Sequence, residues 1–205
     1  MYELTGLYAI TNQPLDSGQL INNVSQALAG GARIVQYRDK GTDQLRRVKE
    51  ARALRDLCRQ YGVPLIINDD MELASKVQAD GIHLGQQDAA LEDARDRLGQ
   101  HCIIGISCYN DFSLAQRAAL KGADYIAFGA FFPSDTKPSA LAASPELLSR
   151  AKQELEIPVV AIGGITPHNA ADLLDAGADM LAVIQGLFAQ PDIESAARAF
   201  SSLFD

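Results

Sequence analysis

Residues 122–130 read GADYIAFGA, and residues 177–184 read GADMLAVI. Both stretches open with the small-residue turn Gly-Ala-Asp and continue as a short apolar run, which is typical of a buried strand. Related turns, Gly-Gly-Ala-Arg from Gly30 and Ala-Asp-Gly from Ala79, precede two further apolar runs. Because these turns recur before alternate strands, the repeating unit is a pair of strands.

Eight apolar runs of this kind alternate with segments of helical spacing. The helical pattern is clearest in Leu45, Val48, Leu54, Cys58 and Tyr61. Strands that are apolar on both faces suit a parallel sheet covered by helices. The predicted strands are Leu7–Thr11, Ile34–Arg38, Pro64–Asp69, Gly81–Gly85, Ile103–Ser107, Tyr125–Ala130, Val159–Gly163 and Met180–Ile184.

This rhythm predicts an α/β fold, a single (β/α)8 TIM barrel that occupies residues 1–205 as one catalytic domain. Such barrels usually take about 250 residues, so this one would be compact. The alternative is an open, doubly wound sheet. Eight consecutive units and the lack of a glycine fingerprint after the first strand disfavour it.

The composition of the chain restricts the kinds of molecule that the protein is expected to bind. The formal net charge is -8 and the pI is near 4.8, which disfavours nucleic acid and favours a phosphorylated small molecule bound by local cations. Cys58, Cys102 and Cys108 form no CxxC pair, which predicts reduced thiols. With no signal peptide and no apolar run of about 18 residues, we expect a cytoplasmic protein with no membrane partner.

The second predicted strand ends in Gln36, Tyr37, Arg38, Asp39 and Lys40. Strand alternation places Gln36, Arg38 and Lys40 on one side and Tyr37 and Asp39 on the other. Two cations on one face of a strand end indicate an anion site. Surface exposure or pairing with Asp39 is the alternative.

Two carboxylates follow neighbouring strands. Asp69 closes the third predicted strand, and Asp88 lies just beyond the fourth. Adjacent strands lie about 4.8 Å apart, so both side chains could reach one ion. Magnesium suits one or two carboxylates combined with substrate phosphate oxygens. The equally plausible alternative is that each Asp caps the helix that follows it.

Two loops offer anion-binding groups. Ser134, Thr136 and Lys137 lie in a long loop after the sixth predicted strand, which could fold over a substrate or be an ordinary polar surface loop. Gly163-Gly164 ends the seventh strand before Thr166-Pro167, a predicted helix start.

The glycines and the end of the eighth strand at residues 183–186 form the usual phosphate position of a barrel. A glycine turn required only by backbone geometry is the alternative.

Conventional nucleophiles are poorly placed. His83 is predicted to pack or hydrogen-bond inside the fourth strand, whereas His101 and His168 resemble loop or helix-start residues. Cys108 has no recognisable neighbouring base and is predicted to pack. The site therefore offers cations, carboxylates and amides, which suits ionisation of a phosphorylated leaving group.

Seven motifs occur in one order along nearly the whole chain. They are LYAIT at residues 7–11, QYRDK at 36–40, ND at 68–69, GIHLGQQD at 81–88, GISC at 105–108, TK at 136–137 and AIGGI at 161–165. Together they resemble the thiamine phosphate synthase family.

The resemblance implies that 4-amino-5-hydroxymethyl-2-methylpyrimidine diphosphate is joined to 4-methyl-5-(2-phosphoethyl)thiazole, with release of diphosphate, by a dissociative pathway. It assigns Gln36, Tyr37, Arg38, Asp39, Lys40, Asn68, Ser107 and Lys137 to the pyrimidine diphosphate, with Arg38, Lys40, Ser107 and Lys137 as catalytic groups. It assigns Asp69 and Asp88 to magnesium (Mg2+), and Ser134, Thr136, Gly164, Ile184 and Gln185 to the thiazole phosphate. A homo-oligomer is compatible with it.

Two residues depart from the usual family pattern. Ser134 replaces a common Thr and keeps the hydroxyl, and Gln185 replaces a small residue while keeping the backbone amide. The rival interpretations are a thiazole tautomerase, a noncatalytic phosphate-binding barrel and a sugar-phosphate isomerase. None of them requires Arg38, Lys137 and the two carboxylates together.

Overall fold

The computed structural model describes residues 2–11, 16–85, 91–133 and 143–205. The strands are β1 (Gly6–Ile10), β2 (Ile34–Tyr37), β3 (Leu65–Asn68), β4 (Gly81–Leu84), β5 (Ile103–Tyr109), β6 (Tyr125–Gly129), β7 (Val159–Ile162) and β8 (Met180–Val183). The helices are α1 (Ser17–Ala29), α2 (Gln44–Tyr61), α3 (Met71–Val77), α4 (Leu91–Leu98), α5 (Phe112–Leu120), α6 (Pro145–Glu154), α7 (Ala171–Asp175), α8 (Gln185–Phe188) and α9 (Ile193–Ser201), followed by the 3-10 turn η1 (Ser202–Phe204).

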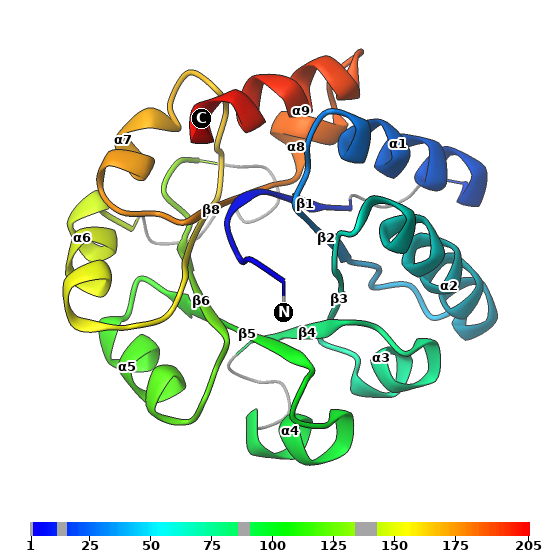
Figure 1. The fold of residues 1–205 in the computed structure, drawn as a ribbon, viewed down its shortest axis with the longest axis horizontal. Helices are drawn as coiled ribbons and strands as arrows, with labels where there is room; N and C mark the ends of the chain where they lie inside the picture. The colour runs from blue at the N-terminus through cyan, green and yellow to red at the C-terminus, as the bar shows by residue number, and fades with distance from the viewer. Residues whose placement is uncertain (1, 12–15, 86–90, 134–142) are drawn as a thin grey trace.

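The eight strands form a closed parallel barrel in the order β1 to β8, with β8 pairing back onto β1. The helices lie around it as an outer ring (Figure 1). The predicted (β/α)8 barrel is confirmed, and the open-sheet alternative is wrong. All eight predicted strands are present, and their ends agree within two residues.

Strand alternation divides the apolar residues into two cores. Residues that point inward, including Tyr8, Ile66, Tyr125 and Met180, form a cluster inside the barrel. Their neighbours along each strand pack outward against the helices in a second, larger cluster. The inner cluster fills the barrel below the site.

The aspartates of the repeated turns join the strands in pairs. In each case the Asp that precedes an even-numbered strand accepts a hydrogen bond from the first or second backbone amide of the strand before it. The pairs are Asp80 with Leu65, Asp124 with Ile104 and Asp179 with Val159, at 2.9, 2.8 and 2.9 Å. The two-strand repeat in the sequence therefore has a physical basis, because one carboxylate fixes the register of three of the four pairs; Arg33 stands at the corresponding position before β2.

Five helices begin at an aspartate whose side chain accepts a hydrogen bond from a backbone amide in the first turn. These N-caps are Asp16, Asp43, Asp70, Asp111 and Asp192. Such a cap contributes about 1 kcal/mol and defines where the helix starts.

The predicted helical spacing from Leu45 to Tyr61 is confirmed as α2, but its apolar residues are not all buried. Leu54 and Cys58 are buried, but Leu45 is 85% exposed and Tyr61 is 46% exposed. The helix instead buries the charged Arg47 and Glu50. These two residues make polar contacts that an apolar periodicity does not reveal.

The predicted free thiols are confirmed, since all three cysteines are buried and unpaired. Burial raises the pKa of the Cys108 thiol to about 12, so it stays protonated and packs, as predicted. Within the described residues, none of the helices combines the length and the apolar character needed to cross a membrane.

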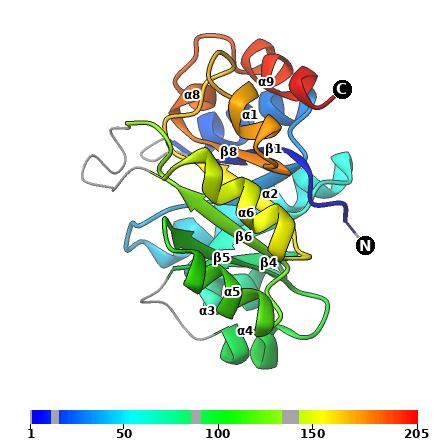
Figure 2. The ribbon, with the colours of Figure 1, turned by 90° about the vertical axis from the view of Figure 1, so that its left-hand side faces the viewer.

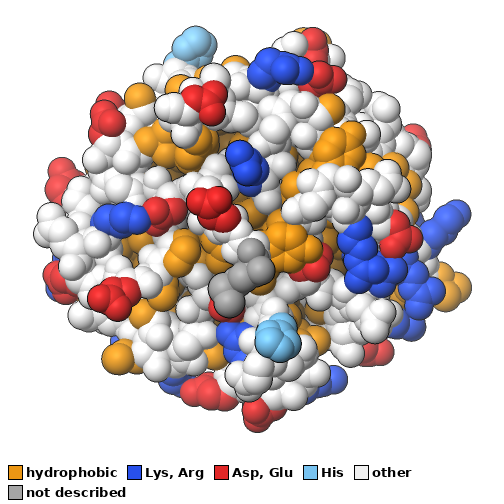
Figure 3. Space-filling model, viewed as in Figure 1, with side chains coloured by type: hydrophobic (Ala, Val, Ile, Leu, Met, Phe, Trp, Pro, Cys, Tyr) orange, Lys and Arg blue, Asp and Glu red, His pale blue; other side chains and the backbone are white. Residues whose placement is uncertain are grey.

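The two ends of the barrel differ. The N-terminal segment lies over the end at which the strands begin, where Leu4 packs against the inner cluster and Tyr2 donates to Asp80. That face carries interspersed acidic and basic side chains (Figure 3). The strands end on the opposite side, at the left of Figure 2.

We predict that Asp124→Ala lowers the free energy of unfolding by about 1–3 kcal/mol, because the Ile104 amide and the Arg95 guanidinium both lose an acceptor. Denaturant unfolding measures the change. Asp93→Ala, an exposed position on α4, is the control and should stay within about 0.5 kcal/mol of the parent. Equal midpoints for the two variants would show that the strand-pair bond contributes little.

Candidate active site

A cavity of about 770 Å³ opens at the ends of the strands. Its wall comes from all eight strands or the turns that follow them, so residues far apart in sequence meet there. The predicted substrate residues that line it are Gln36, Arg38, Asn68, Ser107, Gly164, Ile184 and Gln185.

The side chains of β2 and its following turn divide as alternation predicts. Gln36 and Arg38 line the cavity, whereas Tyr37 packs in the cluster between sheet and helices. Asp39 is buried and Lys40 is exposed, and neither lines the cavity. Tyr37 and Asp39 were predicted as substrate contacts, but their side chains bond to α2 instead.

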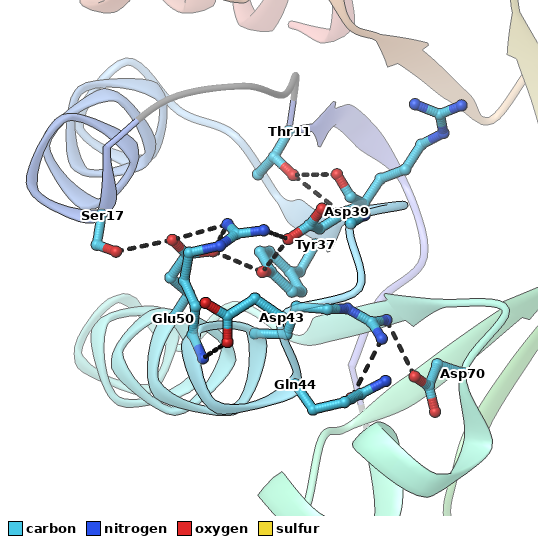
Figure 4. Close-up of polar contacts among 12 residues, drawn as sticks. Thr11, Ser17, Tyr37, Asp39, Asp43, Gln44, Glu50 and Asp70 are labelled. Carbon is cyan, nitrogen blue, oxygen red and sulfur yellow. Dashed lines mark hydrogen bonds and ion pairs between the residues drawn. The ribbon is translucent and has the colours of Figure 1, made fainter.

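A buried polar network supports this turn from the helix side (Figure 4). Glu50 is fully buried and accepts hydrogen bonds from Ser17 at 2.7 Å, Tyr37 at 2.6 Å and Arg46 at 2.9 Å. Arg46 also pairs with Asp39. The network thus ties α1, β2 and α2 together beside the site.

One guanidinium, that of Arg46, faces two carboxylates in this network. Burial opposes the charge of Arg46, but Glu50 and Asp39 outweigh it and raise the guanidinium pKa. Burial and the neighbouring Glu50 raise the pKa of Tyr37, so its hydroxyl remains a neutral donor.

Thr11 holds the backbone of the same turn from the other side. Its hydroxyl accepts from the Arg38 amide at 2.9 Å, and its own amide donates to the Gln36 carbonyl at 2.9 Å. Thr11 was predicted as a strand end and as part of a motif but not as a site residue, because a threonine at a strand end carries no distinctive signal.

Asp69 takes a left-handed backbone conformation, with φ 62°, at the end of β3. The Asn68 side chain donates to the Asp69 carboxylate at 2.6 Å, and the Asp69 backbone amide donates to the His83 carbonyl at 2.9 Å. The following residue, Asp70, caps α3 by accepting from Leu73. The alternative that Asp69 is the helix cap is therefore wrong.

Four predicted site residues lie outside the described residues. They are Asp88, Ser134, Thr136 and Lys137.

The turn after β7 depends on its two glycines. Gly163 and Gly164 have φ values of 107° and 62°. A Cβ at Gly164 would lie 2.5 Å from the Pro133 carbonyl oxygen, so a side chain does not fit. Asn169 closes the turn by accepting from the Thr166 amide at 2.8 Å and donating to the Gly164 carbonyl at 3.0 Å.

The predicted helix start at Thr166-Pro167 is wrong. This segment forms a turn, and α7 begins at Ala171. The side chain of Asn169 bonds to the Thr166 amide and to the Gly164 carbonyl, and these bonds stabilise a turn at this point.

Beside the turn after β7, Ile184 precedes the first turn of α8. The amides of Gln185 and Gly186 are the first of that helix and have no partner within it. Gly186 lies close to the turn after β7, since a Cβ there would meet the Ile165 carbonyl oxygen at 2.4 Å. The two turns together form a backbone-lined corner suited to an anion.

His83, Tyr8 and Tyr109 also line the cavity, and sequence analysis did not assign them to the site. His83 was predicted to pack or hydrogen-bond inside the fourth strand. It does form hydrogen bonds, but its partners Tyr125 and Ser107 lie on β6 and β5. Strand parity was an available signal, because His83 alternates with the outward-facing Ile82 and Leu84. His101 and His168 are exposed and lie outside the cavity wall.

Comparisons with known proteins agree with this arrangement. The family described as thiamine monophosphate synthase matches residues 7–187. The chain belongs to this family. A thiamine-phosphate synthase from Marinobacter nauticus is 55% identical over 202 residues, covering 97% of this chain and 90% of that protein. One from Thiobacillus denitrificans is 51% identical over 199 residues, covering 97% and 94%.

A solved structure shows the same similarity. Thiamine phosphate pyrophosphorylase from Pyrococcus furiosus superposes with a TM-score of 0.87 at 34% identity, covering 97% of this chain and 95% of that one. Like other members of the thiamine monophosphate synthase family, the chain is a transferase.

We predict that Glu50→Ala destabilises the fold by on the order of 3 kcal/mol, because the buried Tyr37 and Ser17 hydroxyls and Arg46 lose their acceptor. Thermal and urea unfolding measure this loss. Glu194→Ala removes an exposed pair with Arg198 and should cost less than about 1 kcal/mol. If both variants unfold at the same midpoint, the network does not brace the site.

Proposed function

We propose that the chain joins 4-amino-5-hydroxymethyl-2-methylpyrimidine diphosphate to 4-methyl-5-(2-phosphoethyl)thiazole, forming thiamine phosphate and releasing diphosphate. The supporting observation is one cavity with two different polar regions. Arg38, Asn68 and Ser107 line one region, and the backbone turns at Gly164 and Gln185 line the other. A cavity of about 770 Å³ falls within the usual size range of small-molecule sites.

The cavity-lining positions and the family resemblance together support the roles. Arg38 and Ser107, together with Lys40 and Lys137, bind the pyrimidine diphosphate. The amides near Gly164 and Gln185, with Ser134 and Thr136, bind the thiazole phosphate. The two substrates then lie side by side in one cavity.

We infer a dissociative reaction. The bond between the pyrimidine methylene carbon and the diphosphate oxygen breaks, and its electron pair leaves with diphosphate. The aminopyrimidine ring stabilises the resulting cation, and the thiazole nitrogen lone pair forms the new carbon–nitrogen bond. Cationic side chains near the leaving oxygens stabilise the charge that builds there.

Asp69 fits a magnesium site because its carboxylate stands at a strand end beside the cavity residue Asn68. We propose that Asp69 and Asp88 hold Mg2+, which would neutralise charge on the diphosphate when bound. A site with only two protein ligands suits magnesium, because substrate oxygens and water complete the coordination shell of the ion.

A cytoplasmic location, a homo-oligomeric assembly and the lack of a nucleic-acid partner remain predictions. The buried free thiols and the net charge of -8 support the first and the last.

The function is tested by incubating the protein with both substrates and Mg2+ and measuring thiamine phosphate and diphosphate. We expect both products in equal amounts, and none when either substrate is omitted. A protein that binds the thiazole phosphate but releases no diphosphate would be a noncatalytic barrel, and the proposal would be wrong.

We predict that Asp69→Asn lowers turnover by about a hundredfold or more and shifts the Mg2+ dependence to higher concentration. Asparagine tolerates the left-handed φ of 62°, so the melting temperature should stay close to that of the parent. Asp70→Asn is the control: it makes the same chemical change at the adjacent residue and should leave the Mg2+ dependence unaltered. An unaltered dependence in Asp69→Asn would remove Asp69 from the metal site.

We predict that Lys137→Ala lowers the bond-forming rate by about a hundredfold to a thousandfold, because one preorganised donor to the leaving group is lost. Single-turnover kinetics at saturating substrate measures this rate. Lys121→Ala, which removes an exposed cation paired with Glu92, is the control and should react normally. A rate for Lys137→Ala within about threefold of the parent would exclude Lys137 from the mechanism.

A further inference from the structure

Five side chains form one continuous hydrogen-bonded path across the inside of the barrel. The Gln36 side-chain amide donates to the Tyr8 hydroxyl at 2.7 Å, and Tyr8 meets the Tyr125 hydroxyl at 2.7 Å. Tyr125 meets His83 Nδ1 at 3.0 Å, and His83 Nε2 meets the Ser107 hydroxyl at 2.9 Å. The path runs from β2 to β5 through strands β1, β6 and β4, so only the closed barrel assembles it.

The bond from Gln36 to Tyr8 fixes the donor-to-acceptor direction of the hydrogen bonds along the path. Burial raises the pKa of Tyr8 and of Tyr125, so each hydroxyl carries one proton. Because Gln36 donates to Tyr8, the Tyr8 proton must point at Tyr125, and the Tyr125 proton then points at His83 Nδ1. The opposite direction would leave the buried Tyr8 proton without an acceptor, which is costly.

This direction sets the state of both ends. A neutral imidazole that accepts at Nδ1 carries its proton on Nε2, and this proton is donated to Ser107. The Ser107 proton is then free to point into the cavity that Ser107 lines. At the other end, the side-chain carbonyl oxygen of Gln36, Oε1, accepts no hydrogen bond from the described residues, and Gln36 lines the same cavity.

Ring packing holds the middle of the path. The His83 and Tyr125 rings stack with centroids 5.6 Å apart, and Tyr8 meets Tyr125 edge-on at 5.9 Å. A Cβ at Gly105 would lie 1.9 Å from Tyr125 Cζ, so this glycine provides the space for the ring.

We propose that Tyr8, Tyr125 and His83 are positioning residues that present a donor at Ser107 and an acceptor at Gln36 to the substrate. The inference rests on the proposed function for the identity of that ligand, the pyrimidine diphosphate. The three residues act through Gln36 and Ser107, and their contacts with those two residues determine which hydrogen-bonding groups a ligand must offer.

Measuring which ring nitrogen of His83 carries the proton tests the direction of the hydrogen-bonded path, and the measurement needs no substrate. A His101→Gln/His168→Gln variant leaves His83 as the only histidine, and both replaced residues are exposed. Two-bond proton–nitrogen NMR spectra of the 15N-labelled protein at mildly alkaline pH should show the proton on Nε2. A proton on Nδ1, or on both nitrogens, would overturn the proposal.

Two tyrosine variants separate the parts of the path. Tyr125→Phe removes the donor to Nδ1, so His83 should show mixed tautomers. Tyr8→Phe leaves that donor in place, so the tautomer should persist while Gln36 loses its anchor. Each variant should raise KM for the pyrimidine diphosphate about tenfold, the effect of about one hydrogen bond, and leave KM for the thiazole phosphate within about twofold.

Tyr2→Phe is the matched control, because it removes a tyrosine hydroxyl bond at the opposite end of the barrel. It should alter neither the tautomer nor either KM. An unchanged tautomer in Tyr125→Phe, or equal rises of both KM values, would overturn the positioning role. If Tyr125→Phe does not fold, the parent spectrum and Tyr8→Phe still decide the question. A chain that makes no thiamine phosphate but shows the Nε2 proton would refute the proposed function and retain the path.

Discussion

The carboxylate that joins the two strands in three of the four strand pairs is the interaction on which the rest of the structure depends. Asp80, Asp124 and Asp179 each bind the backbone of the preceding strand at the end where the strands begin. This fixes which residue of one strand lies beside which residue of the next. A shift of one residue would turn every inward side chain outward, so the composition of the cavity at the far end depends on this register.

The same alternation gives β2 two separate functions. The inward residues of the strand and its following turn, Gln36 and Arg38, line the cavity. Their outward neighbours, Tyr37 and Asp39, bind the network around Glu50. In the outward network Arg46 pairs with both Glu50 and Asp39, and the network holds the turn that carries Arg38. A motif of five consecutive residues therefore combines ligand contact with the support that positions it.

The cavity uses different chemistry in its two polar regions. Side chains with defined hydrogen-bond direction occupy the barrel interior, where Tyr8 and Tyr125 replace the aliphatic residues that usually fill a barrel. Backbone amides and glycine turns occupy the corner between β7 and β8, where any side chain at Gly164 would clash with Pro133. The corner therefore offers N–H groups to an anion, whereas the interior selects by the placement of donors and acceptors.

The sequence by itself determined the barrel, its eight strands and the inward placement of Gln36 and Arg38, because periodicity and repeated turns are local properties of the chain. It also supplied the ordered motifs on which the family resemblance depends. The burial of Glu50 on α2, the cap at Asp70 rather than Asp69 and the turn closed by Asn169 were decided by tertiary contacts. The path from Gln36 to Ser107 was likewise decided only by the structure. Its members come from five strands and become neighbours only when the sheet closes on itself, and no pattern within one strand records that closure.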